Sequence, residues 1–287
     1  MSDNHAPVIQ AVRFHKEIRM GSSLPVLVDG NDGNAYVVKL NGAGDGILSN
    51  VVEWMSSKLG ALLQIPVLQP VFVIIDANFA KQAADPETRE LLERSVGINL
   101  GTSYLPNAST YSEQYAPGRD DFLKQQIFLF DLFLLNVDRT AINPNMIIHD
   151  GKLWCLDYST AMEIRSIIIS ETYREHVLLR PLKTHPFYGD KLTPYGFINH
   201  LREIPDDSIR NLVDSIPAEW LGSLKLAKNN TEPRRAITEK LRHKMKNGIT
   251  LHARLDLLRV LKVETTEEAR LRNLENKKLF EQKYGRL

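Results

Sequence analysis

The chain has 287 residues, of which 43% are hydrophobic and 25% charged, and these proportions are those of an ordinary globular protein. Its 36 Lys and Arg residues balance 35 Asp and Glu residues, so the overall charge gives no argument for nucleic-acid binding. A single cysteine excludes an internal disulfide, and the sequence contains neither a secretory signal pattern nor a run of about 18 apolar residues that would span a membrane. We therefore expect a cytoplasmic protein that contacts neither a membrane nor nucleic acid directly.

The first hundred residues are predicted to alternate strands with one helix. The segments 35–40 and 70–76 are rich in β-branched and aromatic residues between turn-forming residues, which is typical of strands. Between them, apolar residues recur at spacings of three and four and predict a helix over 51–64, ended by Pro66. This apolar stripe consists of Leu48, Val52, Met55, Leu59, Leu62 and Leu63.

Helical patterns dominate the chain after residue 119. The segment 121–136 is apolar nearly all round, which predicts a helix buried in the middle of the fold. Further helical patterns follow over 206–216 and 251–261. The basic segment 232–248 fits a solvated helix face, and it also fits a docking face for an acidic partner. We expect an α+β fold in which a small strand-rich part precedes a larger helical part.

Residues 146–158 carry the pattern of a β-hairpin, in which two strand-like runs flank an Asp-Gly dipeptide. A strict two-residue turn would place Asn145 and Asp157 on opposite faces of the hairpin. A three-residue loop with a bulge at its glycine would instead place Asn143 opposite Asp157. In both arrangements these side chains gather at the open end of the hairpin, next to the loop that carries Asp138.

Asp and Asn oxygens that converge in this way suit Mg²⁺, which takes one or two carboxylates together with substrate phosphates. A second aspartate nearby can accept the proton of a hydroxyl nucleophile. The alternative is a purely structural loop, because Asn, Asp and Pro are favoured in turns for local backbone reasons. The succession of an apolar helix, Asp138, an asparagine five residues later, a hairpin and Asp157 favours a phosphotransferase.

These segments, "NVDRTAINPNMII" and "LDYSTA", resemble the catalytic and metal-binding segments of the HipA-like kinases, which share the fold of protein kinases and phosphatidylinositol kinases. The order of features resembles the family over residues 15–220. The resemblance implies a two-lobed protein-kinase-like fold, with a nucleotide-binding N-terminal lobe over 1–105 and a helical C-terminal lobe over 106–287. The second lobe would carry the catalytic loop and the metal-binding hairpin.

By this resemblance Asp138 is the catalytic base and Asp157 is the metal ligand, in an Asp-Tyr-Ser sequence where ordinary protein kinases have Asp-Phe-Gly. Two asparagines compete for the remaining metal position. Asn143 has the kinase spacing of five residues from Asp138, whereas Asn145 directly precedes the hydrophobic strand, as the kinase asparagine also does. Both remain candidate metal ligands.

The resemblance also implies Lys39 as the strand lysine that binds the α- and β-phosphates of ATP, and Glu53 as its helix partner. Lys39 shares a strand face with Val37 and Ala35, which would give the adenine an apolar wall. An exposed lysine at the end of a strand is the alternative. Glu53 also fits a capping box with Asn50, in which its carboxylate would bind the N-terminus of its own helix.

Two further segments are expected to contact ATP. The phosphate-covering loop lacks the kinase glycine pattern, but its backbone N–H groups could bind an anion at Gly21, Ser22 and Ser23. By analogy with the family, Ser22 or Ser23 is also a regulatory phosphorylation site. The linker between the lobes is expected to hold the adenine at Ser103, Tyr104 and Leu105. A rival pattern, Gly42-x-Gly44-x-Gly46 between a strand and a helix, is similar to a dinucleotide-binding turn, although its glycine spacing differs.

The residues and the resemblance together predict an ATP- and Mg²⁺-dependent kinase whose acceptor is a serine or threonine of an unidentified protein partner, its own chain included. A small-molecule or lipid-headgroup kinase is an alternative, because the Asp138-Arg139 pair is also similar to that of phosphatidylinositol kinases. A nucleotide-binding module without effective catalysis is another alternative, because the phosphate loop is a poor match.

Overall fold

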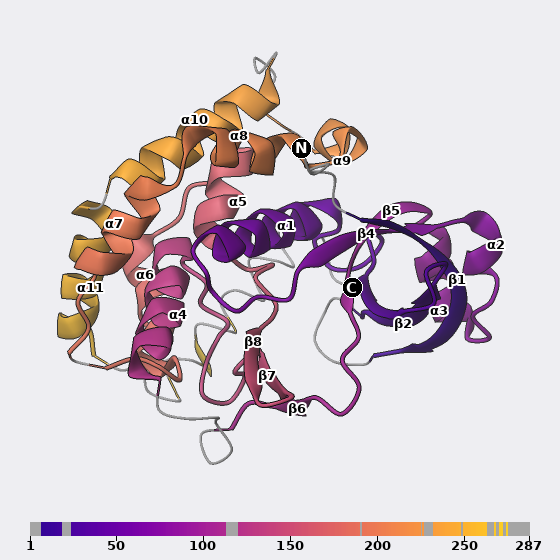
Figure 1. Cartoon of the computed structure of the whole chain (residues 1–287), viewed down its shortest axis with the longest axis horizontal. Helices are drawn as coiled ribbons and strands as arrows, with labels where there is room; N and C mark the ends of the chain where they lie inside the picture. The colour runs from indigo at the N-terminus through magenta and orange to yellow at the C-terminus, as the bar shows by residue number, and fades with distance from the viewer. Residues whose placement is uncertain are drawn as a thin grey trace.

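The computed structural model describes residues 7–18, 24–112, 120–189, 191–224, 226, 232–247 and 249–262, together with 267, 270, 271 and 274. Its N-terminal part is rich in β-strands and its C-terminal part is helical, as Figure 1 shows. The mixed α/β composition and the order of the two parts expected from the sequence are confirmed. Within the described ranges, no helix has both the length and the apolar character needed to cross a membrane.

Five strands close into a barrel in the order β1, β2, β3, β5, β4. Neighbouring strands are antiparallel except β1 and β4, which are parallel. Side chains that alternate toward the inside build an apolar core in which Val28, Val38 and Val73 are fully buried. The strands are β1 (Val8–Glu17), β2 (Val26–Gly30), β3 (Ala35–Lys39), β4 (Pro70–Ile75) and β5 (Gly97–Ser103).

The predicted strands over 35–40 and 70–76 are therefore β3 and β4. Because β3 lies between β2 and β5 and is antiparallel to both, it is not part of the parallel sheet that a dinucleotide-binding turn requires. That alternative interpretation of Gly42, Gly44 and Gly46 is wrong. The three glycines form the turn into the next helix, and Gly44 and Gly46 have φ angles of 54° and 62°.

Helix α1 (Ile47–Leu62) begins four residues before the predicted start, with Gly46 as its N-cap. It ends where Gln64 adopts a left-handed φ of 58° and the N–H of Ile65 donates to the carbonyl of Gly60 at 2.9 Å. Pro66 therefore follows the end of the helix and does not itself terminate it. In Figure 1, α1 lies between the barrel and the helices of the C-terminal part.

The larger apolar core combines α1 and the outer side of the barrel with the helices of the C-terminal part. Trp54 of α1 stacks on Phe72 of β4, with 4.2 Å between ring centroids. Phe72 in turn meets the ring of Trp220 edge-on at 5.4 Å. This core thus includes residues from both sides of residue 105, and the division into 1–105 and 106–287 stays a prediction.

Helix α4 (Asp121–Leu134) is the helix predicted over 121–136. Asp120 caps its start, because its carboxylate accepts a hydrogen bond from the N–H of Leu123 at 2.9 Å. All residues from 127 to 134 are buried, and Leu135 ends the helix in the left-handed conformation. A second sheet has three strands in the order β6 (Ser109–Thr110), β7 (Met146–His149) and β8 (Lys152–Cys155), and α4 lies between β6 and β7 in the sequence.

Short helices complete both parts of the fold. In the N-terminal part, Asp76 caps α2 and Asp85 caps α3 with side-chain oxygens. The helices predicted over 206–216 and 251–261 are α8 and α11. The bounds are α2 (Ala77–Ala80), α3 (Pro86–Glu93), α5 (Met162–Ile169), α6 (Glu175–Leu179), the 3₁₀ helix η2 (Pro181–Thr184), α7 (Tyr195–Glu203), α8 (Asp206–Asp214), α9 (Ala218–Ser223), α10 (Pro233–Lys246) and α11 (Ile249–Val260).

The basic segment 232–248 contains α10, and Arg234 and Arg242 of this helix bind both ends of α8. Arg234 donates to the carbonyls of Val213 at 2.7 Å and Ile216 at 2.6 Å, which satisfies the C-terminal end of α8. Arg242 Nε lies 3.3 Å from the carboxylate of Asp206 at the start of the same helix. Part of the positive charge of α10 therefore serves to fix α8.

Candidate active site

Lys39, Glu53 and Asp157 meet in one ion-paired group, although Lys39 and Asp157 are 118 residues apart in the sequence. Lys39 Nζ lies 3.1 Å from Glu53 Oε2 and 2.8 Å from Asp157 Oδ1. The side chain of Lys39 is only 20% exposed, so the alternative of a solvated lysine at the end of a strand is wrong. The structure thus brings together three of the predicted site residues, from the barrel, from α1 and from the segment after β8.

The carboxylate of Glu53 binds two segments at once. Besides Lys39, its Oε2 accepts a hydrogen bond from the backbone N–H of Tyr158 at 2.6 Å. Because α1 begins at Ile47, Glu53 lies beyond the first turn and does not form a capping box with Asn50. Asn50 instead donates to the backbone carbonyl of Lys39 at 3.2 Å. Glu53 therefore ties the lysine strand to the segment that carries Asp157.

Burial and mutual charge set the protonation of this group. Burial opposes the charged form of Lys39, but the carboxylates of Glu53 and Asp157 outweigh it and raise the pKa of Lys39 above its usual value. Burial would raise the pKa of Asp157, yet Lys39 and the hydrogen bonds from Ser159 hold that pKa below its usual value. Burial, together with the charge of Asp157, raises the pKa of Glu53 in spite of Lys39. At neutral pH, Lys39 is a cation and Asp157 an anion.

The hairpin that leads to Asp157 has a two-residue turn. Asp150 and Gly151 have positive φ angles of 48° and 69°, as a type I′ turn requires at both central positions. His149 pairs with Lys152, and the remaining pairs follow the same register. The alternative of a three-residue loop with a bulge is therefore wrong.

The open end of the hairpin departs from regular strand geometry on both sides. The N–H of Leu156 donates to the carbonyl of Asn145 at 2.8 Å, which extends the pairing by one step. Asn145 and Asp157 have φ angles of 46° and 54°, in the left-handed region. The expectation that a two-residue turn places their side chains on opposite faces assumes an extended backbone, so it does not apply to these two residues.

Two asparagines orient Asp138. The Nδ2 atoms of Asn143 and Asn145 donate to Asp138 Oδ2 at 3.1 Å and 3.0 Å, and Asn143 also donates to the backbone carbonyl of Asp138 at 3.2 Å. Burial raises the pKa of Asp138 above its usual value, the bond from Asn145 opposes this rise, and the charge of Asp157 adds to it. The two aspartates are therefore close enough to influence each other electrostatically.

Arg139 connects the Asp138 loop to the residues that flank the two strands of the hairpin. Its guanidinium is fully buried and donates from Nε to Asp131 Oδ2 at 2.6 Å. Its Nη1 donates to the carbonyls of Pro144 and Asn145, and its Nη2 donates to the carbonyl of Leu156 at 3.3 Å. Sequence reasoning missed this role. Asp131, a single acid within the apolar run of α4, is the signal that could have indicated a buried cation.

His185 completes the group around Asp131. Its Nε2 lies 2.9 Å from Asp131 Oδ2, and its Nδ1 accepts a hydrogen bond from the N–H of Phe187 at 3.0 Å. A ring that accepts at Nδ1 and donates from Nε2 is neutral. Burial, which is the largest influence, lowers the pKa of His185 below its usual value. His185 is therefore neutral in the folded protein at neutral pH.

The segment predicted to hold the adenine follows β5. Ser103 is the last residue of that strand and pairs with Tyr36 on β3, while Tyr104 is exposed and Leu105 half-buried. Lys39 is three residues from Tyr36, so the linker begins about 10 Å along the sheet from the lysine. The predicted phosphate-covering loop falls between β1 and β2 in the sequence. Its predicted residues, Gly21, Ser22 and Ser23, lie outside the described residues.

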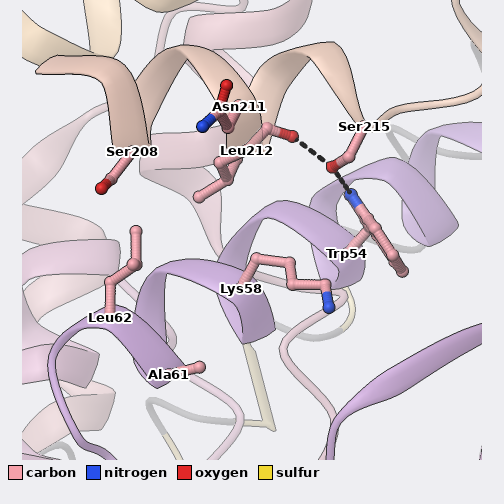
Figure 2. Close-up of a pocket in the computed structure, with 8 residues that line it drawn as sticks. All are labelled: Trp54, Lys58, Ala61, Leu62, Ser208, Asn211, Leu212 and Ser215. Carbon is pink, nitrogen blue, oxygen red and sulfur yellow. Dashed lines mark hydrogen bonds between the residues drawn. The ribbon is translucent and has the colours of Figure 1, made fainter. Parts of the chain in front are cut away.

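Figure 2 shows a hollow between α1 and α8. The residues of α1 that line it are rotated by about 80° to 180° around the helix from Glu53. They are Trp54, Lys58, Ala61 and Leu62. Trp54 donates from its indole N–H to Ser215 Oγ at 3.1 Å and so joins the two helices. None of the predicted site residues lines this hollow, which is separate from the candidate active site.

Acid should destabilise the fold through His185. An unfolded histidine has a pKa of about 6.5, so below that pH the unfolded chain binds a proton that the folded chain does not bind. The free energy of unfolding is therefore fully maintained above about pH 6.5 and should fall below it, by up to about 1.4 kcal/mol per pH unit. Urea unfolding between about pH 5 and pH 7.5 measures this slope.

His185→Gln should reduce the slope by the contribution of one proton, because the amide does not titrate. His176→Gln, at an exposed histidine of α6, is the matched control and should keep the wild-type slope. If the His185 variant and the wild type lose stability in parallel as the pH falls, His185 is not the group that titrates.

No curated protein matches this chain. Among solved structures, the Helicobacter pylori proinflammatory kinase CtkA aligns with a TM-score of 0.46 and 10% identity, over 88% of this chain and 97% of the other. The Golgi casein kinase aligns with a TM-score of 0.46 and 12% identity, over 89% and 74%, and its structure with Mn/ADP bound aligns with a TM-score of 0.46 and 14% identity, over 88% and 73%. A family model of the HipA-like kinases matches residues 11–248. The chain therefore belongs to the HipA-like kinase family.

Proposed function

We propose that this protein is an ATP- and Mg²⁺-dependent kinase that phosphorylates serine or threonine hydroxyls of proteins, including its own chain. The observation that carries the proposal is the meeting of Lys39, Glu53 and Asp157, together with Asn145, which donates to Asp138 and whose carbonyl accepts from Leu156, the residue before Asp157. A lysine paired with a helix glutamate, a metal-binding aspartate and a second aspartate that accepts a proton are the parts from which protein kinases build their site. Here they come together from distant segments of a chain that belongs to a kinase family.

The proposed architecture has two lobes, over 1–105 and 106–287, with the nucleotide bound between them. Lys39 and Glu53 come from the first segment, and Asp138 and Asp157 from the second. The ion pair between Lys39 and Asp157 supports the proposal, because a site assembled from both segments requires the segments to close on each other.

The outer face of β3 fits an adenine ring. Val37 shares this face with Lys39, and its partners across the sheet are Leu27 on β2 and Thr102 on β5. Residues directly opposite in an antiparallel pair point to the same face, so these three side chains form a mainly apolar row. The row crosses the strands at the level of Val37, between the pair Tyr36–Ser103 and Lys39. An adenine on this row would direct its phosphates to the lysine.

The oxygens near Asp138 and Asp157 fit a magnesium ion. The hydrogen bonds that Asp157 receives from described residues all end on Oδ1, which leaves Oδ2 for a cation. Asn145 gives its N–H to Asp138, which leaves its amide oxygen as a ligand. We assign the role of metal ligand to Asn145 and not to Asn143, because the backbone of Asn145 pairs with Leu156, the residue before Asp157. Bound there, Mg²⁺ would neutralise phosphate charge.

Asp138 is the proposed general base. In the reaction, the acceptor oxygen forms a bond to the γ-phosphorus of ATP, and the bond from that phosphorus to the oxygen bridging to the β-phosphate breaks. ADP leaves, and the proton of the acceptor hydroxyl passes to Asp138. The asparagines hold Oδ2 of Asp138, while no described residue donates to its Oδ1. That second oxygen is the one proposed to receive the proton.

Asp157→Asn should lower phosphate transfer by about 100-fold or more, because a neutral amide of the same volume removes the charge that binds the metal. The measurement is incorporation of γ-phosphate from labelled ATP in the presence of Mg²⁺, with the modified residues located by mass spectrometry. Asp150→Asn is the matched control. Asp150 lies in the exposed hairpin turn, where asparagine is equally favoured, so this variant should keep the wild-type rate. Wild-type transfer by Asp157→Asn would contradict the metal assignment.

The two asparagines should differ in the Mg²⁺ dependence of transfer. Asn145→Ala removes a proposed metal ligand and should raise the Mg²⁺ concentration needed for half-maximal transfer by about 10-fold or more. Loss of a residue that supports a metal ligand already weakens metal binding by about 10-fold to 100-fold. Asn143→Ala removes a comparable bond to Asp138 and should leave that concentration within a few-fold. A Mg²⁺ titration of both variants tests the assignment, and the opposite ranking would move the ligand to Asn143.

Asp138→Ala should leave ATP affinity within a few-fold while it lowers phosphate transfer by about 100-fold or more, which is typical for loss of a general base. ATP affinity is measured by titration calorimetry, and transfer by the labelled-phosphate assay. A parallel loss of ATP affinity would show that Asp138 serves the nucleotide or the metal instead of the acceptor.

A further inference from the structure

Ile142 is the most exposed large apolar residue in the part of the chain that the structure describes, with 97% of its surface accessible. It lies in the catalytic loop, four residues after Asp138 and one residue before Asn143, and its neighbour Ala141 is also exposed. Exposed turns usually carry Gly, Asn, Asp or Ser. Single apolar residues on a surface are common, but this one stands beside the proposed base.

The loop that presents Ile142 has a fixed backbone. The N–H of Thr140 donates to the carbonyl of Asn143 at 2.9 Å, and the N–H of Asn143 donates back to Thr140 Oγ1 at 3.1 Å. On the other side, the N–H of Ala141 donates to the carbonyl of Thr184 in η2 at 2.8 Å. A partner that covers Ile142 would therefore not have to order the loop first, which favours binding.

The position of Ile142 relates it to the phosphate acceptor. Asn143 donates to both the side chain and the backbone of Asp138, so the residue before it is held next to the proposed base. A polypeptide whose hydroxyl reaches Asp138 must pass close to this loop and can cover Ile142 with a neighbouring side chain. A small acceptor in an enclosed pocket would instead be surrounded by buried groups, and Ile142 is not one of them.

We propose that Ile142 is a specificity-determining contact for the acceptor, and that it selects an extended polypeptide with an apolar residue close to the phosphorylated serine or threonine. This inference rests on the proposed kinase function and narrows its acceptor to a class of protein segment. The selectivity arises because covering Ile142 with an apolar side chain removes apolar surface from water on both partners.

A lipid surface is the other partner that an exposed apolar side chain suits. Two features favour the polypeptide. The exposed apolar residues of this loop are limited to Ala141 and Ile142, which is little area for insertion into a bilayer. The loop also carries the carboxylate of Asp138, which anionic headgroups would repel.

The experiment is a positional-scanning library of peptides with a fixed central serine or threonine, incubated with labelled ATP and Mg²⁺. The wild type should prefer Leu, Ile, Val or Phe at one position near the acceptor by about 10-fold over Asp or Lys, the order expected for burying one apolar side chain. At that same position, Ile142→Glu should change the preference to Lys and Arg, and Ile142→Lys should change it to Asp and Glu. Each profile compares peptides on one variant, so a general loss of activity cancels.

Val12→Glu and Val12→Lys are the matched controls, because Val12 is an exposed valine on β1 and should not affect the profile. A profile unchanged in both Ile142 variants overturns the inference. So does weaker binding of these variants to phosphatidylcholine–phosphatidylserine vesicles together with unchanged peptide selection, which would indicate a membrane contact. Phosphate transfer to the chain itself without any peptide selection also overturns it but leaves the kinase function in place. No consumption of ATP at all overturns the proposed function.

Discussion

The buried carboxylate of Glu53 is the interaction on which the rest of the site depends. One of its oxygens binds both the ammonium of Lys39 and the backbone N–H of Tyr158, so the barrel, α1 and the segment after the hairpin meet at one atom. A buried carboxylate is costly unless it is paired, and both partners belong to other segments. The requirement to satisfy Glu53 therefore couples the packing of α1 to the position of Asp157.

A second buried ion pair supports the other half of the site. Arg139 pairs with Asp131 of α4 and donates to backbone carbonyls on both sides of the hairpin, so it fixes the loop that carries Asp138. Removing one partner of such a pair typically costs about 3–5 kcal/mol.

The pKa values of the two aspartates of the site shift in opposite directions. The cation of Lys39 lowers the pKa of Asp157, while burial raises the pKa of Asp138. This separation agrees with the proposed roles of Asp157 at the metal and of Asp138 as the base.

Local patterns in the sequence were sufficient for the elements that carry the site. The apolar stripe of α1, the nearly all-apolar α4 and the Asp-Gly turn are signals that act over a few residues, and each predicted an element that the structure contains. The order of Lys39, Glu53, Asp138 and Asp157 could also be recognised in the sequence. Its resemblance to a kinase family agrees with the family match. The roles of these residues in catalysis stay predictions.

Tertiary structure decided the questions in which a local and a distant partner compete. From the sequence, Glu53 could form a capping box at the start of its own helix or pair with a lysine 14 residues away. The structure excludes the capping box, because α1 begins at Ile47. The N-cap is Gly46, which makes no side-chain hydrogen bond that the sequence could have indicated. The sequence likewise did not predict that β1 closes the barrel or that Arg139 is buried against Asp131. The sequence by itself determined the elements and their chemistry, because these depend on neighbours along the chain. Only the tertiary structure determined the contacts, because a buried charge is satisfied by whichever partner packing brings to it.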